Sequence, residues 1–284
     1  MNVLLSAASV VVLFLVIYWR WKKEDRLREI FWPALFFKLF AGLALGLLYT
    51  YYYPTGDTFT FFNDGVLLAE WGKADFLGYV NFLWSADESV AVWKSLAGHA
   101  DRTLFLSRMV SVVNLVTGSN YWVTSLYFSF LSFMCSIALV RVLLRCFPEI
   151  KFAAISSFMF LPSVVFWGSG VLKECVAIAS LFFLAAIVVR VMKNERPEVT
   201  DWLLAVLFCW LLWKVKYYYA AVFLIIATTG VIVKFISSAL KIKNVGIALA
   251  LWLVVFMVPL FFVSLSKGNF QCHHSELFRL SAFI

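Results

Sequence analysis

Long apolar segments separated by short polar ones make up most of this chain, and they limit the folds that are open to it. A helix needs roughly 20 apolar residues to cross the hydrocarbon core of a bilayer. Of the 284 residues, 63% are hydrophobic and 14% are charged, proportions that a water-soluble core of this length does not have. The sequence therefore predicts an all-α, polytopic membrane protein in which residues 1–284 form a single transmembrane domain.

Eight segments are predicted to span the membrane. Lysine and arginine residues are concentrated in the loops that follow the first, third, fifth and seventh of them. Basic loops remain on the cytoplasmic side, so we expect a multi-pass protein of the cell inner membrane with both termini outside. The net charge of +8 then reflects topology and does not indicate nucleic-acid binding. The eight segments are residues 3–19, 31–51, 121–144, 152–167, 175–189, 202–213, 217–233 and 245–265.

The segment 52–120 is too long for a plain connection between two helices. Apolar and polar residues alternate along it in a pattern typical of short amphipathic helices that lie in the membrane interface. Residues 104–116 are predicted to form a second interfacial or re-entrant helix. This extracytoplasmic loop could act as a cap over the helix bundle or as a platform that binds a substrate, and both interpretations stay open.

Two carboxylates, Asp57 and Asp64, follow the second predicted span closely. Ionisable groups at membrane depth are costly and tend to mark functional sites. Gly56 and Thr58 flank Asp57 and suit a rigid turn at the mouth of a cavity. Such a carboxylate can act as a general base on a hydroxyl group or as a ligand of a divalent cation. The cofactor is left open, with a divalent cation as the candidate.

Two turns on the same outer side carry charged residues that we expect to be recessed. The sixth predicted span has twelve residues, about 18 Å of helix at 1.5 Å per residue, so the turn after it should lie below the membrane surface. The turn at 167–174 is similarly tight and contains two glycines. Charged, irregular backbone at this depth is tolerated where it lines a cavity. The recessed residues are Lys173, Glu174, Lys214 and Lys216, and Arg102 and Arg108 could line the cavity mouth.

Recessed cations suit a phosphate or pyrophosphate group on a lipid, because that group needs charge neutralisation from the membrane side. The alternative for Lys173 and Glu174 is a local salt bridge, and for Lys214 and Lys216 it is anchoring among lipid headgroups. We expect Lys173 and Lys214 to approach each other.

No metal site built from protein residues alone is predicted. Cys272, His273, His274 and Glu276 stand close together near the carboxyl end, but adjacent histidines on one short segment do not easily face the same ion. The five cysteines show no C-x-x-C spacing, which argues against a zinc site or structural disulfides.

Two motifs resemble those of a known enzyme class. Gly-Asp-Thr-x-x-x-Phe at 56–62, followed by Asp64 and amphipathic segments, looks like the first outer loop of GT-C-type glycosyltransferases. The stretch Leu-Pro-Ser-Val-Val-Phe-Trp-Gly-Ser-Gly-Val-Leu-Lys-Glu at 161–174 resembles a motif in bacterial membrane proteins of that kind. The resemblance covers about residues 31–235. It implies transfer of a sugar from a polyprenyl-phosphate-linked donor, with Asp57 matching the catalytic acid and Asp64 a second candidate.

Three hypotheses on function therefore stand side by side. The first is a membrane glycosyltransferase of cell-envelope polysaccharide biosynthesis, with membrane lipid and a lipid-phosphate-linked sugar as partners. The second is a non-enzymatic transporter or flippase of a lipid-linked saccharide, and the third is a structural membrane assembly subunit. The orientation of Asp57 relative to the cavity distinguishes them.

The predicted topology can be tested by labelling single cysteines. Cysteine introduced at Ser89 should react with a membrane-impermeant thiol reagent added outside the cell, whereas cysteine at Ser238 should react only from the cytoplasmic side. This follows from the distribution of basic residues among the loops. Labelling of both positions from one side would contradict the eight-span arrangement.

Overall fold

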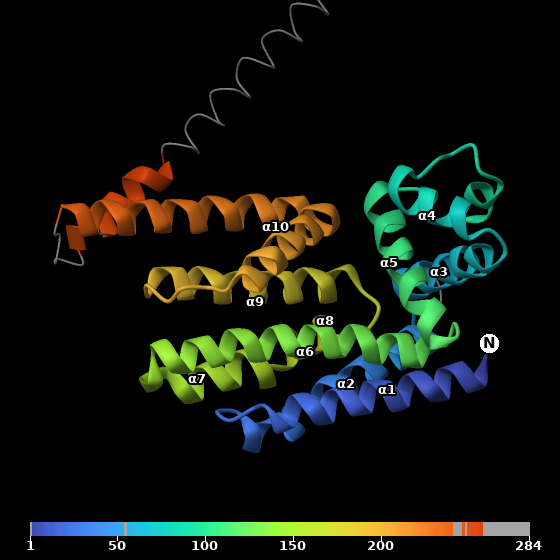
Figure 1. The fold of residues 1–284 in the computed structure, drawn as a ribbon, viewed down its shortest axis with the longest axis horizontal. Helices are drawn as coiled ribbons and strands as arrows, with labels where there is room; N and C mark the ends of the chain where they lie inside the picture. Colours follow the sequence, from blue (N-terminus) through green and yellow to red (C-terminus); the bar gives the residue numbers. More distant parts are fainter. Residues whose placement is uncertain (1, 54–55, 241–245, 248, 258–284) are drawn as a thin grey trace, which may run out of the picture. The chain divides into compact units, whose positions relative to one another are not determined.

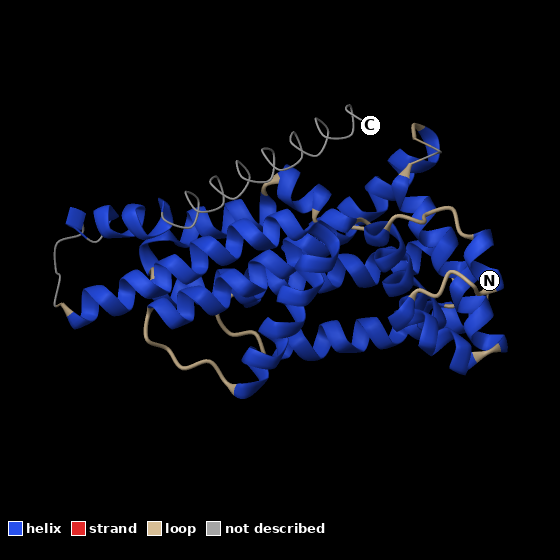
Figure 2. Cartoon of the chain, turned by 90° about the horizontal axis from the view of Figure 1, so that it is seen from above, coloured by secondary structure: helices blue, strands red, loops and turns tan. Residues whose placement is uncertain are grey.

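The computed structural model describes residues 2–53, 56–240, 246–247 and 249–257, and the regular structure within these ranges is helical (Figures 1 and 2). The chain divides into two units, residues 1–219 and 220–284. All of the predicted site residues belong to the first unit, so the description concentrates on it. Residues 272–276, considered above for a metal site, lie outside the described residues.

Five described helices are long and apolar enough to cross a membrane. Four of them match predicted spans one to one, and the fifth covers the sixth and seventh predicted spans together. By length and composition, these helices are candidate membrane spans. The helices are α1 (Val3–Lys22), α2 (Arg28–Tyr51), α6 (Tyr121–Cys146), α9 (Lys173–Met192) and α10 (Val199–Ala239).

The prediction of eight separate spans needs correction at two places. Residues 152–167 form short pieces, α7 (Lys151–Ile155), a π-helical turn (Ser156–Phe160) and α8 (Pro162–Trp167), with Leu161 extended between the last two. Pro162 has no N–H and disfavours helical geometry in the residue before it, which accounts for the extended backbone at Leu161. Within α10 the backbone leaves helical geometry at Lys216 (φ −146°, ψ 75°), which divides the helix without a loop.

The eighth predicted span, residues 245–265, lies largely outside the described residues. Its described part is helical at 246–247 and 249–257.

Helix α6 is the centre of the first unit and contacts α2 and α9 along most of its length. One face of α6 carries serines at helical spacing, and all of them are at most 2% exposed. The hydroxyl of Ser125 donates to the carbonyl of Gly42 in α2 at 3.3 Å. Small side chains let helices approach closely in a membrane, where interhelical hydrogen bonds add roughly 0.6 kcal/mol each. The serines of this face are Ser125, Ser129, Ser132 and Ser136.

The segment 52–120 folds as a small helical assembly with its own core. It contains α3 (Asp57–Ala74), α4 (Phe76–Ser85), a 3₁₀ turn (Ala91–Ser95) and α5 (Asp101–Thr117). Helices α3 and α5 lie side by side over much of their length. The buried core residues are Leu68, Tyr79, Phe82, Leu96 and Leu104. Figure 1 shows these helices gathered at the end of the first unit where α1 begins.

Basic residues close the opposite ends of the transmembrane helices. Arg20 and Lys22 stand in the last turn of α1, Arg145 in that of α6 and Arg190 in that of α9. Several are paired: Arg145 with Glu195 at 2.8 Å, Arg190 with Asp201 at 2.5 Å, and Arg141 with the buried Glu24. The α3–α5 assembly and the basic helix ends therefore lie at opposite ends of the first unit.

The close packing of α2 on α6 can be tested at Gly42. A Cβ at this position would lie 2.4 Å from Ser129 Oγ, so Gly42→Ala should lower the free energy of unfolding by about 1–3 kcal/mol, as overpacking does. Thermal unfolding of the detergent-solubilised protein measures this. The matched control is Gly230→Ala in α10, where a Cβ meets nothing within 4 Å and the better helix former should leave stability equal or higher. Equal behaviour of the two variants would contradict the packing described here.

Candidate functional site

Asp57 is the first residue of α3, directly after Gly56 at the helix N-cap. Gly56 passes so close to Tyr49 of α2 that a Cβ there would lie 2.1 Å from the Tyr49 ring. This approach fixes where α3 begins relative to the end of α2. Asp57 is exposed, and its charge acts on the hydroxyl of Tyr49 and on the ammonium group of Lys173. The carboxylate therefore lies within electrostatic range of the start of α9.

Lys173 connects three helices at this end of the first unit. It is the first residue of α9, and its Nζ donates to Thr103 Oγ1 of α5 at 2.9 Å. The same atom lies 4.7 Å from the centre of the Phe61 ring of α3, within range of a cation–π interaction. The charges that act on Lys173 are those of Asp57, Glu174, Lys216 and Arg102. Five predicted site residues thus share one electrostatic neighbourhood.

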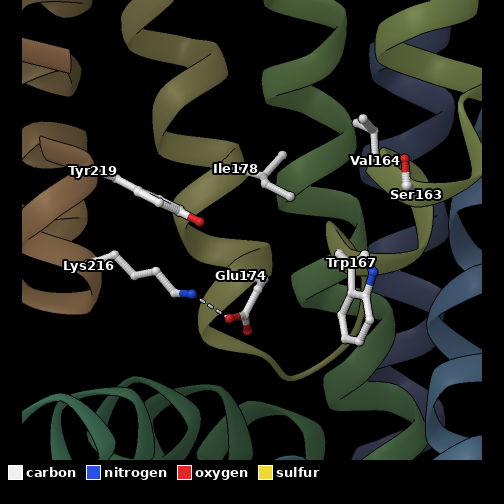
Figure 3. A pocket seen from close by; sticks show the side chains of 7 residues that line it. All are labelled: Ser163, Val164, Trp167, Glu174, Ile178, Lys216 and Tyr219. Carbon is white, nitrogen blue, oxygen red and sulfur yellow. Dashed lines mark hydrogen bonds and ion pairs between the residues drawn. The ribbon is translucent and has the colours of Figure 1, made fainter. Parts of the chain in front are cut away.

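Glu174 and Lys216 form an ion pair beside Lys173. Lys216 Nζ lies 2.5 Å from Glu174 Oε1, and Figure 3 shows the two side chains pointing toward one another from α9 and α10. Lys216 is the residue whose backbone leaves helical geometry. Its ammonium group also lies 5.3 Å from the Tyr219 ring, and Arg102 lies 4.5 Å from the Tyr217 ring. Aromatic faces thus flank the charged cluster.

A cavity of about 470 Å³ opens beside this ion pair. Its wall combines apolar side chains with the ion pair, the hydroxyls of Ser163 and Tyr219 and the indole N–H of Trp167 (Figure 3). This composition is typical of pockets that bind the apolar part of a ligand and orient it through a few polar groups. The lining residues are Ser163, Val164, Trp167, Glu174, Ile178, Lys216 and Tyr219.

Asp64 lies apart from this cluster and is 1% exposed. Its two carboxylate oxygens accept hydrogen bonds from the backbone N–H groups of Ala97 at 2.8 Å and Gly98 at 2.9 Å. Hydrogen bonds to an ionised acceptor are among the stronger ones in proteins. Asp64 therefore fixes the chain between the 3₁₀ turn and α5 onto α3.

Arg108 and Lys214 also lie away from the cluster. Arg108 donates to the carbonyl of Leu83 at 3.1 Å, and burial lowers the pKa of its guanidinium. It lines a second, smaller cavity with apolar side chains of α4, α5 and α10. Lys214 is exposed, and it is Lys216, two residues later, whose charge acts on Lys173.

Several residues that shape the site were not singled out from the sequence. Thr103, Phe61 and Tyr49 contact or act on the charged groups, but no local pattern marks them. Ser163 and Trp167 of the cavity wall do stand in the 161–174 motif. That motif is the sequence signal that leads to the cavity.

No protein-family model matches the chain, and no curated protein or solved structure is significantly similar to it. Its function is therefore argued from the site.

A divalent cation would find few protein ligands here. Among the described residues, no group of three or more His, Cys, Asp or Glu side chains could hold a metal ion. Glu174 is paired with Lys216, and Asp64 accepts from two backbone N–H groups. Magnesium ions at phosphate groups are often held by one or two carboxylates and by substrate oxygens. Asp57 is the carboxylate that could coordinate such an ion together with oxygens of the substrate.

The different surroundings of the two aspartates give a test. Asp64→Asn should lower the free energy of unfolding by about 1–3 kcal/mol, because a buried N–H then faces an amide donor instead of a carboxylate. Asp57→Asn should leave stability nearly unchanged, because Asp57 is exposed. Thermal unfolding of both variants in the same detergent provides the comparison. A larger loss for Asp57→Asn would contradict these assignments.

Proposed function

We propose that the protein is a membrane glycosyltransferase of the GT-C type that transfers a sugar from a polyprenyl-phosphate-linked donor to an acceptor at the outer face of the inner membrane. The proposal is carried by Lys173, on which the charges of Asp57 and Arg102 act, next to Glu174 of an apolar cavity with the Glu174–Lys216 ion pair in its wall. The apolar wall suits a lipid chain. The cations suit a phosphate group.

The proposed orientation follows from the arrangement of the first unit. The basic helix ends lie opposite the α3–α5 assembly, and basic residues favour the cytoplasmic side. The site is then open to the outside, where a lipid-linked donor presents its sugar after translocation. In this orientation the charged cluster would bind the phosphate of the donor, and the apolar wall of the cavity would contact its lipid chain.

In the proposed reaction Asp57 is the general base. It accepts the proton of an acceptor hydroxyl while the hydroxyl oxygen attacks the anomeric carbon of the donor sugar. The bond from that carbon to the phosphate oxygen breaks, and polyprenyl phosphate departs with the electron pair. Lys173 and Arg102 stabilise the negative charge that develops on the departing phosphate. Each of these residues is placed by a different helix, so the site depends on the fold of the first unit.

A second candidate function is transport of a lipid-linked saccharide without chemistry. The backbone break at Leu161 favours it, because irregular backbone at membrane depth accompanies substrate sites in many transporters. In this case the cations bind the same phosphate, and Asp57 has no proton to accept. A structural assembly subunit would need neither the cavity nor the free carboxylate.

The proposed role of Asp57 is tested by Asp57→Asn. Removal of a general base lowers the rate by about 10²–10⁴-fold, whereas binding of the lipid donor should persist because the amide keeps the shape of the side chain. The measurement is release of polyprenyl phosphate from a panel of polyprenyl-phosphate sugars by protein reconstituted in vesicles.

The matched control is Asp87→Asn. Asp87 is an exposed carboxylate that accepts a hydrogen bond from the nearby Ser89 N–H at 2.9 Å, and its loss should leave the rate unchanged. Wild-type activity of Asp57→Asn would overturn the catalytic proposal. Movement of intact lipid-linked sugar across the vesicle membrane, with no release of polyprenyl phosphate, would establish the transporter instead.

A further inference from the structure

Lys38 is a buried cation in the middle of an apolar helix. It lies in α2 and is 3% exposed. No hydrogen bond or ion pair joins its ammonium group to another described residue. The titratable groups that act on it are the thiols of Cys135 and Cys175, and neither is a carboxylate. A lysine kept in such surroundings is costly and tends to have a function.

The ammonium group of Lys38 lies beside two residues of the cavity wall. A Cβ on Gly168 would stand 2.6 Å from Lys38 Nζ, 2.6 Å from the carbonyl oxygen of Val164 and 3.5 Å from Ile178 Cγ2. Val164 and Ile178 both line the cavity, and Figure 3 shows them in its wall. The absence of a side chain at Gly168 makes room for the ammonium group at this place.

The charges around the cavity leave Lys38 without a counter-ion. Glu174 and Lys216 neutralise each other at 2.5 Å. Lys38 is a further cation next to Val164 and Ile178 of the cavity wall. In a low-dielectric wall this charge attracts an anion in the cavity more strongly than it would in water. A bound anion would in turn keep the amine in its charged form.

We propose that Lys38 is the inner anion-binding residue of the cavity, and that the anion is a phosphate group. The identity of the anion rests on the proposed function, whereas the existence of the subsite rests on the position of Lys38. Lysine acts on a phosphate as a compact charge with three N–H donors. The Glu174–Lys216 pair then shapes the opening of the cavity, and Lys38 supplies its unbalanced charge. A lipid and free phosphate in solution are both sources of this group, and the test separates them.

The test measures binding of inorganic phosphate and of polyprenyl phosphate, which carries no sugar, to protein in detergent. Lys38→Met should weaken binding by about 10–100-fold, the range for loss of one charge-assisted hydrogen bond. Lys38→Arg should retain most of the affinity. The matched control is Lys151→Met, which removes an exposed lysine at the start of α7, outside the cavity. Its affinity should stay within about threefold of the wild type, well short of the factor of ten that corresponds to 1.4 kcal/mol.

Wild-type affinity in Lys38→Met, with a folded protein by size-exclusion chromatography, would overturn the proposal, as would an equal loss of binding in Lys151→Met. If Lys38 only stabilises its neighbours, Lys38→Met will lower the unfolding temperature without changing phosphate affinity, which also overturns the proposal. Lys38→Gln serves as the second neutral variant if Lys38→Met does not fold. Binding of inorganic phosphate but not of polyprenyl phosphate would support the subsite and count against the lipid donor of the proposed function.

Discussion

The position of the charged residues depends on hydrogen bonds between the serines of α6 and the backbone that precedes α9. Ser129 Oγ accepts from the N–H of Gly170 at 2.9 Å, and Gly170 has a positive φ of 69° that favours glycine. Ser169 Oγ donates to the carbonyl of Lys38 at 3.2 Å and to that of Val165 at 2.6 Å. A bilayer interior offers no water to these groups, so they must find partners within the bundle. The turn that carries Lys173 and Glu174 is therefore held against α2 and α6 at the same time.

The two aspartates of the first motif show how similar residues take different parts in one structure. Asp64 satisfies two backbone N–H groups and is fully surrounded by protein. Asp57 stands seven residues earlier at the start of the same helix, exposed and close to cations of other helices. The position of each aspartate along the helix does not show which of them is structural. The long-range hydrogen bonds from Ala97 and Gly98 to Asp64 do show it.

Features that depend on local composition could be predicted from the sequence. The spans that became α1, α2, α6 and α9 follow from apolar length alone. Residues 152–167 are equally apolar, but Pro162 divides them, and apolar length alone does not show where the backbone breaks. Lys216, and not Lys214, pairs with Glu174. The backbone of α10 leaves helical geometry at Lys216 itself, which the sequence does not reveal. The neighbours of Lys38 come from α6, α8 and α9, so only the folded bundle reveals them.

Helix α8 is a short rigid segment bounded by a backbone break on each side. Leu161 is extended before it, and Gly168 and Gly170 follow it. The part of the cavity wall formed by Ser163, Val164 and Trp167 is therefore set by two bends in the backbone. A Cβ on Gly168 would lie 2.6 Å from Lys38 Nζ, and one on Gly170 would lie 3.1 Å from Leu45 in α2. The close approach that packs the bundle thus also fixes the shape of the cavity, so neither can be altered alone at these glycines.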